Sequence, residues 1–536
     1  MMTIALLLVI CLVILILLKW TRNIEKQPPR LRDFIPYISN TWEFMTNKKW
    51  FIARVTEALR RSPVVQCQLG PLNLYFITGT THVSTLFKTS FSSDPWVLRI
   101  LERIAGYLPV NLVKFSRDNS GCSRQPLVGS DESVRPEERI WYALHNNYSK
   151  ALIGPQSVQT FSKSYQAYFD RQLAVLMNKE AAGGLDVFNF LRQSMSNAAT
   201  RAMFGPGIID VNPDFIDAFW KFEKWAEPLV FGLPSWLNRT GIKARDRMNA
   251  MCTKWYELSD RKFDWDSAMA GTDDEWEPIF GSPMSRGLAR WGKSFNFSTD
   301  SMGPVYTLFV FALHSNTIPI CTWIMMELLQ DADLLRAIKL EVSQALVHNK
   351  NSSEKIDLQK LLSMPLLQSV YVEALRLHVG ILITRTSTAP VTIAGYNFPA
   401  GTVFQAPTQV SHIREDVWGT PEYPASQFWA YRHVKEKHVT NEAGGNRKHL
   451  ELSISARSGA FYPYGGGASM CPGRNLAKAE VLLTVAMLVS RLDMKFVEWL
   501  KLDGSISDRP AQDDTKYANS VAAPPDREMR VRWQKV

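Results

Sequence analysis

The residues best suited to chemistry form a glycine-rich loop around one cysteine near the end of the chain. The segment 461–474 reads FYPYGGGASMCPGR, and its three consecutive glycines remove side chains from the loop. Glycine lets the backbone approach a flat or bulky group closely. Cys471 directly precedes a predicted helix over 473–492, and Pro472 suits the first turn of that helix. Unpaired N–H groups and the positive dipole end meet at a helix N-terminus, so we expect them to favour the thiolate of Cys471.

A lone thiolate in such a loop restricts the kind of site that it can form. Zinc usually takes a complete tetrahedral set of ligands, whereas a single thiolate suits one axial position of a haem iron. The glycines match neither G-x-x-x-x-G-K-[ST] nor G-x-G-x-x-G, which excludes the common phosphate-binding loops. The alternative interpretation is a buried structural cysteine beside a glycine turn.

With this loop the chain resembles the cytochrome P450 family. The family's haem signature is F-G-x-G-x-R-x-C-x-G, which this chain fills with Tyr464, Gly465, Gly467, Cys471 and Gly473. Tyr464 replaces the usual phenylalanine, and Ser469 stands where an arginine or histidine normally contacts a haem propionate. The resemblance implies that Cys471 is the axial ligand to the iron of haem b (iron protoporphyrin IX). It also implies that the three glycines of the signature border this cofactor.

Asn316 and Thr317 lie in an apolar segment that predicts one long helix over 302–329, and Pro319 should kink it. The corresponding helix of the family reads [AG]-G-x-[DE]-T, whose acid and alcohol deliver protons during oxygen activation. Thr317 keeps the alcohol and Asn316 replaces the acid, and the resemblance implies a catalytic role for both. The run Asn-Thr-Ile-Pro resembles the branch with sterol 7α-hydroxylases and prostacyclin synthase, which contains monooxygenases and isomerases. Alternatively, the two side chains only satisfy the kinked backbone.

Three charged residues resemble the family's structural network. Glu373 and Arg376 share one face of a predicted helix over 364–378 and match the motif E-x-x-R. Arg432 matches the arginine of an F-x-P-x-R segment, with alanine in place of proline. The resemblance implies a buried charge cluster that holds the haem-binding segment, in which loss of one member would leave the others unpaired.

Three further residues resemble cofactor-binding positions of the family. Arg385 matches a frequent propionate-binding arginine after the E-x-x-R helix. Trp141 and His145 resemble the motif W-x-x-x-R, with histidine in place of arginine. For Trp141 and His145, core packing on an amphipathic helix is the alternative interpretation.

Many helices and a few short strands, without βαβ alternation, predict one mainly α domain with small β-sheets. Apolar spacing of three and four predicts helices over 137–152, 156–180, 187–204, 213–227 and 332–348. Strands are predicted over 64–69, 72–78, 391–393 and 402–405, and 259–300 is predicted to be a loop with helical pieces.

The N-terminus predicts a membrane anchor. From Met1 to Leu18 the only polar side chain is Thr3, and 18 residues at about 1.5 Å each suffice to cross a hydrocarbon core. Basic residues follow this span, so the positive-inside rule places the rest of the chain in the cytosol. A cleaved signal peptide is the alternative, but its charged n-region and small-residue cleavage site are not found. We therefore expect a transmembrane anchor over 1–18, a basic and proline-containing hinge over 19–36, and a catalytic domain over 37–536.

Composition excludes several other classes of protein. The chain of 536 residues is 46% hydrophobic and 21% charged, as is usual for a globular protein. Its 6 cysteines contain no CxxC pair, which excludes a disulfide-stapled scaffold and a zinc ribbon. The net charge of +10 is modest and spread out, so no nucleic-acid partner is expected.

The resemblance implies a single-pass monooxygenase of the endoplasmic reticulum membrane that oxidises a hydrophobic small molecule of terpenoid, steroid or alkaloid type. Its electrons would come from NADPH through a cytochrome P450 reductase. A P450-fold isomerase or dehydratase acting without O2 or reductase is the alternative, which Asn316 keeps open. A non-catalytic haem protein is a further alternative, against which the retained Thr317 argues.

Overall fold

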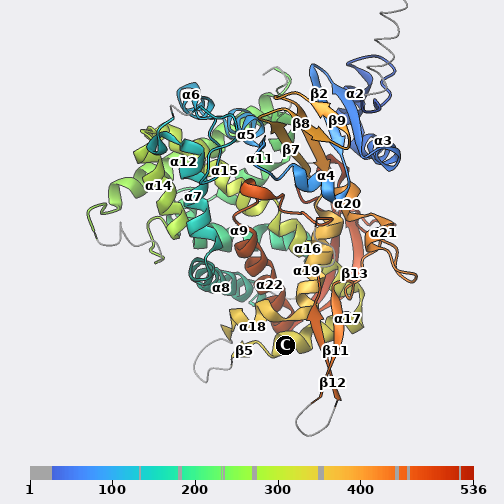
Figure 1. Cartoon of the computed structure of the whole chain (residues 1–536). Coiled ribbons are helices and arrows are strands. Elements are labelled where there is room, and N and C mark those ends of the chain that lie inside the picture. Colours follow the sequence, from blue (N-terminus) through green and yellow to red (C-terminus); the bar gives the residue numbers. More distant parts are fainter. Residues whose placement is uncertain are drawn as a thin grey trace, which may run out of the picture.

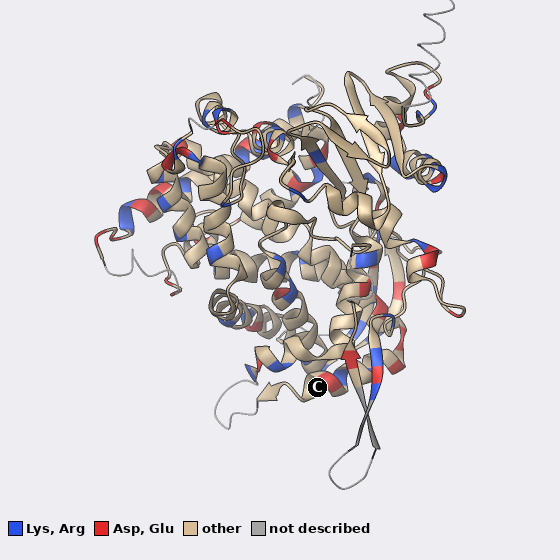
Figure 2. Cartoon of the chain, in the orientation of Figure 1, with Lys and Arg blue, Asp and Glu red and all other residues tan. Residues whose placement is uncertain are grey.

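The protein is described by a computed structural model over residues 27–131, 134–178, 184–230, 232, 236–267, 275–347, 355–440, 446–454, 459–517 and 521–536. It is mainly helical with small sheets, as predicted; most helices gather to one side of the five-stranded sheet, whereas α2 and α3 pack at its other side (Figure 1). Lys and Arg are interspersed with Asp and Glu over the ribbon, and the central helices carry few of either (Figure 2).

The helices of the first half are α2 (Ser39–Thr46), α3 (Lys48–Arg61), α4 (Thr80–Thr85), α5 (Asp94–Ile100), α6 (Pro109–Arg117), α7 (Ile140–Ile153), α8 (Pro155–Met177), α9 (Val187–Phe204), α10 (Gly207–Asp210), α11 (Phe215–Val230) and α12 (Arg239–Lys262). Those of the second half are α14 (Pro283–Ser294), α15 (Thr299–His314), α16 (Thr317–Gln330), α17 (Ala332–Ser343), α18 (Leu358–Ser363), α19 (Pro365–His378), α20 (Thr408–His412), α21 (Glu415–Trp418) and α22 (Arg474–Arg491).

Five short sheets occur among the described residues. The largest has the order β1 (Val64–Leu69), β2 (Leu72–Ile77), β10 (Val403–Pro407), β7 (Leu382–Ser387) and β3 (Phe91–Ser92), with β10 parallel to β2 and the other pairs antiparallel. A second sheet has the order β13 (Leu492–Lys501), β14 (Arg527–Lys535) and β4 (Leu185–Asp186). Three hairpins pair β5 (Leu346–Val347) with β6 (Lys355–Ile356), β8 (Val391–Ile393) with β9 (Tyr396–Phe398), and β11 (Val434–Thr440) with β12 (Asn446–Leu452).

The helix predicted over 302–329 is two helices, α15 and α16, separated at Ser315 and Asn316. Proline has no N–H, so Pro319 cannot donate to the carbonyl oxygen of Ser315 four residues earlier. The interruption therefore lies one turn before the proline. This agrees with the prediction that Pro319 disturbs the helix. Hydrogen bonding resumes from Ile320 N to Asn316 O, at 3.2 Å.

Helix α12 was not predicted, and it packs beside α15 in the helical region. Its buried side chains form a narrow stripe at helical spacing: Met248, Cys252, Trp255, Tyr256 and Ser259. Charged residues cover the rest of the helix, so its average hydrophobicity is low and the apolar stripe is easily overlooked.

The predicted anchor over 1–18 and residues 19–26 of the predicted hinge lie outside the described residues. The described part of the hinge is attached to β1, because Gln66 N donates to Pro29 O at 2.9 Å and Leu31 N to Gln66 O at 2.8 Å. Among the described residues, the stretch Thr299–Gln330 is long and apolar enough to cross a membrane, and 78% of its most apolar window is buried inside the protein.

Candidate functional site

The cysteine loop lies against Phe87, which follows α4. Gly465 and Gly467 have positive φ values of 71° and 69°, which favour glycine. A Cβ atom on Gly467 would lie 2.5 Å from the carbonyl oxygen of Phe87, and one on Gly466 would lie 2.6 Å from its ring. The loop is closed by a hydrogen bond of 3.0 Å from Cys471 N to Tyr464 O. The glycines are therefore required by the path of the loop itself.

Cys471 lies just before the N-cap residue of α22, which is Gly473. Of the cysteines in the described part of the chain, only Cys471 is exposed, whereas Cys67, Cys252 and Cys321 are buried. Protein atoms nevertheless surround the thiol closely, and this burial raises its pKa. The backbone N–H groups of Gly473 and Arg474 and the Arg474 charge act in the opposite direction, as expected at a helix N-terminus. A coordinating metal ion would stabilise the thiolate form of Cys471 further, since a bound metal ion deprotonates a thiol.

Arg385 and Ser469 lie at one end of the loop, around a cavity of about 110 Å³ that Phe87, Asp94 and Gly466 also border. The guanidinium of Arg385 is 7% exposed and donates to the carbonyl oxygens of Thr384 and Gly466 at 2.9 and 3.2 Å. Burial raises the pKa of Asp94 to about 6, and its Oδ2 has no hydrogen-bond partner among the described residues. Sequence reasoning missed Asp94, because it belongs to no motif.

His145 lies on α7 beside a second cavity of about 650 Å³, which shares Cys122, Ser123 and Ala468 with the first. Its Nδ1 is 3.4 Å from Ser149 Oγ, and its buried Nε2 has no partner among the described side chains. Burial lowers the pKa of His145, which favours the neutral ring.

Trp141 is buried and turned into the core. Its indole N–H donates to Phe115 O at 3.0 Å, and its ring lies 4.7 Å from that of Phe115. These contacts agree with the alternative interpretation, core packing. The indole N–H of Trp141 already has a protein acceptor, Phe115 O, and is not free to bind a cofactor.

The residues around the cysteine suit a haem better than a metal ion bound by side chains alone. No group of three or more His, Cys, Asp or Glu able to hold a metal ion occurs in the described ranges. One exposed cysteine at a helix N-terminus provides a single axial sulfur ligand. Arg385 supplies a cation, and His145 Nε2, which has no partner among the described residues, supplies a polar atom, for the carboxylates of such a group.

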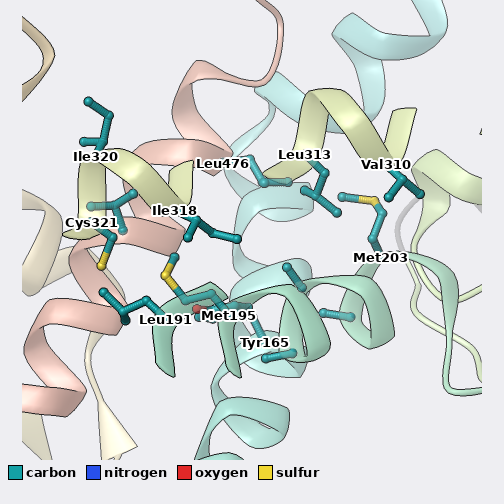
Figure 3. Close-up of a cluster of buried hydrophobic side chains, with 14 of the residues drawn as sticks. Tyr165, Leu191, Met195, Met203, Val310, Leu313, Ile318, Ile320, Cys321 and Leu476 are labelled. Atoms are coloured by element: carbon teal, nitrogen blue, oxygen red, sulfur yellow. The ribbon is translucent and has the colours of Figure 1, made fainter. Parts of the chain in front are cut away.

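The helix break at α15–α16 lies close to the start of α22. Leu313 of α15 and Leu476 of α22 belong to one buried cluster and lie side by side in Figure 3. At the break, the Thr317 hydroxyl donates to Leu313 O at 2.9 Å, and Asn316 Oδ1 accepts from Ala522 N at 2.9 Å. Asn316 is exposed although most neighbouring residues of the two helices are buried.

The predicted charge cluster is present and is centred on Glu373, which is 0% exposed. Its Oε1 and Oε2 accept from Arg376 at 2.8 Å each, and its Oε1 accepts from Arg432 Nε at 2.8 Å. Burial alone would raise the pKa of Glu373, but the hydrogen bonds and charges of Arg376 and His433 lower it to about 2. Sequence reasoning missed His433, whose Nε2 lies 2.9 Å from Glu373 Oε2. Its position directly after Arg432 was the available signal.

The ends of α15 and α19 carry two further histidines that sequence reasoning missed, His314, which is buried, and His378, which is half-buried. His314 Nε2 lies 2.9 Å from Thr200 Oγ1 of α9, and burial lowers the pKa of His314 to about 3. His378 stacks on Trp323 with ring centroids 4.0 Å apart, and its Nδ1 lies 2.7 Å from Asp513 Oδ1. Both residues join elements far apart in the sequence.

Comparison with known proteins places this geometry in a family. The sequence model of cytochrome P450 matches residues 125–499. The chain is 38% identical to the cytochrome P450 monooxygenase calL of Penicillium decumbens, over 97% of this chain and 95% of the relative. It is 22% identical to cytochrome P450 7A1 of Sus scrofa, over 91% of both chains, and 22% identical to abscisic acid 8'-hydroxylase 2 of Oryza sativa subsp. indica, over 78% and 76%. The chain therefore belongs to the cytochrome P450 family, among its monooxygenases.

Proposed function

We propose that this chain uses a haem held by Cys471 to hydroxylate, or otherwise oxidise, a hydrophobic small molecule of terpenoid, steroid or alkaloid type. The observation that carries the proposal is the exposed sulfur of Cys471 at the N-terminus of α22, a helix that packs against α16. When bound, the haem supplies the oxygen-activating chemistry, with O2 as oxidant. A relative's name, abscisic acid 8'-hydroxylase 2, is that of an enzyme that hydroxylates abscisic acid, which supports a hydroxylation here.

Each predicted site residue except Trp141, which packs in the core, has a place in this proposal. Cys471 provides the sulfur ligand, and the glycines at 465, 467 and 473 shape the loop and the helix start that hold it. Arg385 and His145 border the cavities at the other end of the loop, where they would bind the haem carboxylates. Glu373, Arg376 and Arg432 pin the segment leading to the loop.

Asn316 and Thr317 have different parts in proton delivery. The Thr317 hydroxyl donates to a backbone carbonyl and keeps lone pairs with which Oγ1 can accept from a water molecule. The Asn316 oxygen is engaged by Ala522 N, so the NH2 group is the end that can orient water. Proton transfer therefore passes through Thr317 Oγ1, and Asn316 positions rather than donates.

Electrons and location follow from the same proposal. A membrane-bound NADPH–cytochrome P450 reductase would supply the electrons, and the anchor over 1–18 would hold this chain on the cytosolic face of the same membrane, that of the endoplasmic reticulum. Arg474 and Lys478, near the start of α22, are basic residues that could dock an acidic surface of the reductase, but Arg474 donates to Cys471 O at 3.0 Å and Lys478 donates to Gln368. Both residues therefore have partners within the chain.

The amide at Asn316 favours one alternative, an isomerase or dehydratase that needs no external protons. The test is turnover of the purified full chain with reductase, NADPH and labelled O2. The product should carry the label, and NADPH should be consumed in proportion. Product made at full rate without NADPH, or without label, would establish the isomerase instead.

The ligand is tested by spectroscopy. Reduced protein with CO should show the red-shifted Soret band of thiolate-ligated haem, and Cys471→Ala should lose it. Cys122→Ala, a half-buried cysteine beside the second cavity, is the matched control and should keep the band. An unchanged spectrum in Cys471→Ala would move the ligand to another residue.

A further inference from the structure

The cavities at the Arg385 end of the cysteine loop are short of positive charge for a haem, which carries two carboxylates. Ser469 is uncharged at the position where the family normally has an arginine or histidine. Burial lowers the pKa of His145, so its ring is neutral. The pKa of Asp94 is raised only to about 6, so at neutral pH this acid is largely ionised and offsets part of the Arg385 charge. Arg385 alone therefore leaves one carboxylate without a cation.

Besides Arg385, two lysine or arginine residues of the described ranges border these cavities, Lys88 and Arg124. Lys88 borders the first cavity only, where Arg385 already lies. Arg124 borders the second cavity together with Ala468, which directly precedes Ser469 and borders both cavities. Arg124 therefore faces the space beside the position where the family's cation is missing.

The backbone of Arg124 is fixed by a buried arginine, Arg139. This residue is 7% exposed, and its Nη1 donates to Arg124 O at 2.9 Å. Its Nη2 donates to Ser123 O at 2.6 Å and its Nε to Ser120 Oγ at 2.8 Å. Arg139 directly precedes α7, the helix that carries His145. The segment with Arg124 is therefore held to the helix that borders the second cavity.

The rest of this segment is fastened at its base. Asp118 Oδ1 accepts from Ser120 N at 3.0 Å, and its Oδ2 accepts from Trp141 N at 3.2 Å. Leu127 N donates to Ser120 O at 2.9 Å. In contrast, Arg124 is exposed, and its guanidinium has no hydrogen-bond partner among the described residues. A fixed backbone that carries a free cation can bind an anion by ordering only one side chain, which keeps the entropic cost low.

We propose that Arg124 supplies the cation that is missing at Ser469 and binds one haem carboxylate, while Arg385 binds the other. This inference rests on the proposed haem ligand. A guanidinium can donate two parallel N–H groups to a carboxylate, and such a charge-assisted pair is stronger than a neutral hydrogen bond. The Ser149 hydroxyl can donate to Nδ1 of the neutral His145 ring, which leaves the ring proton on the unpartnered Nε2 for the same carboxylate.

The test measures how fast the haem-loaded full chain loses haem to excess apomyoglobin, followed by absorbance. Arg124→Gln should lose haem about fivefold to tenfold faster, the range between an exposed ion pair and a hydrogen bond to a charged group. Arg124→Lys should lie between this variant and the unaltered protein, because lysine keeps the charge but not the two parallel donors. Adding Ser469→Arg to Arg124→Gln should slow the loss again, since it returns a cation to the family's position.

Arg117→Gln is the matched control. Arg117 is an exposed arginine at the end of α6, next to the same segment, and it borders neither cavity. Its removal changes the net charge as Arg124→Gln does and should leave haem loss unchanged. Lys88→Gln tests the other cation at the cavities and should have a smaller effect than Arg124→Gln.

Three results would overturn the inference. An unchanged rate in Arg124→Gln would show that its side chain does not hold the haem. Equally fast loss from Arg124→Gln and Arg124→Lys, without rescue by Ser469→Arg, would show that its charge is not what matters. A larger effect of Lys88→Gln would assign the second cation to Lys88. All variants should keep the long-wavelength CO band, because Cys471 is unaltered. Failure of this inference is therefore distinguishable from failure of the Cys471 assignment, in which the unaltered protein itself would lack the band.

Discussion

Asn316 and Thr317 are adjacent but serve different parts of the molecule. The side-chain oxygen of Asn316 accepts a hydrogen bond from Ala522 N and so joins the turn at Ala522 to the helix break. The Thr317 hydroxyl instead donates a hydrogen bond to Leu313 O in the preceding helical turn. Because the Ala522 N–H requires an acceptor, the Asn316 oxygen must face it. Replacing the usual acid by an amide has therefore exchanged a proton donor for a structural tie.

We expect Thr317→Ala to keep haem and substrate binding but to divert electrons to peroxide. An amide can orient water but cannot release a proton as an acid does, so the hydroxyl carries more of the proton transfer. Product formation should fall by ~10²-fold or less, the lower end of what positioned proton transfer contributes. Product and hydrogen peroxide are measured per NADPH consumed.

Thr322→Ala is the matched control for this prediction. Thr322 lies on the same helix, is buried, and makes the same bond to the carbonyl four residues earlier, Ile318 O, at 2.8 Å. It should leave the ratio of peroxide to product unchanged. Equal ratios in Thr317→Ala and Thr322→Ala would contradict the proposed role of the hydroxyl.

At the scale of elements, α11 is held by two acids that reach segments distant in sequence. Glu223 accepts from the Tyr517 hydroxyl at 2.9 Å, and Glu227 forms an ion pair with Lys48 of α3. Lys48 also donates to Lys516 O at 2.9 Å. The segment around Lys516 and Tyr517 therefore joins α11 to α3.

We expect the contribution of Glu223 on α11 to the stability of the protein to fall as pH rises toward neutrality. Burial raises the pKa of Glu223 to about 7, from an ordinary value near 4.5, and the Tyr517 hydrogen bond and Arg192 only partly offset this. Asp514 acts in the same direction as burial. A folded-state pKa above the unfolded one means that stability is present below about pH 4.5 and is lost through pH 7.

The measurement is thermal unfolding of the full chain and of Glu223→Gln between pH 5 and 8. The unaltered protein should lose stability relative to the variant over this range, by at most about 3 kcal/mol. Asp217→Asn, an exposed acid on the same helix, is the control and should follow the unaltered protein. Parallel curves for Glu223→Gln and the unaltered protein would show that Glu223 titrates normally.

Elements with a strong local pattern could be predicted, and those that depend on distant contacts could not. Helix α9 has the predicted bounds 187–204, since its apolar residues recur at helical spacing. The strand pair β1–β2 was predicted from Gly70 and Pro71 between two apolar runs. The cysteine loop and the Glu373 cluster were found through motifs, but His433 was missed because its partner Glu373 is 60 positions away and only folding brings the two together. The role of Asn316 was not foreseeable, since its partner Ala522 is 206 positions away.

At the scale of the whole molecule, two segments of the described chain carry several strongly exposed apolar side chains each, besides others scattered elsewhere. The residues near the start of the described chain with large exposure are Phe34 at 70%, Ile35 at 58%, Trp42 at 68% and Trp50 at 59%. In the segment before α12, Trp236 is 66% and Leu237 is 55% exposed. Large aromatic and aliphatic groups of this kind favour a bilayer interface.

We expect deletion of residues 1–26 to leave a folded haem protein that no longer spans a membrane but still adheres to it. The described fold begins after this segment and pairs with β1 from Pro29 onward. The measurement is the CO spectrum, followed by flotation of the truncated chain with phosphatidylcholine vesicles. Trp236→Ser with Leu237→Ser in the truncated chain should reduce flotation, whereas Val347→Ser, in the hairpin β5–β6, should not. A truncated chain without haem would show that the anchor is part of the fold.

The tie between Asn316 and Ala522 has a consequence for how the protein is made in the cell. Residues 471 and 522 come late from the ribosome, and at about 5–20 residues per second they follow the first residue by roughly half a minute to two minutes. Helices α7 to α16 are complete well before then, with their apolar faces lacking α22 and the turn at Ala522. Until these residues are synthesised, the nascent chain keeps apolar surface exposed. We therefore expect chaperones, and the supply of haem when the chain is released, to govern how much active enzyme accumulates.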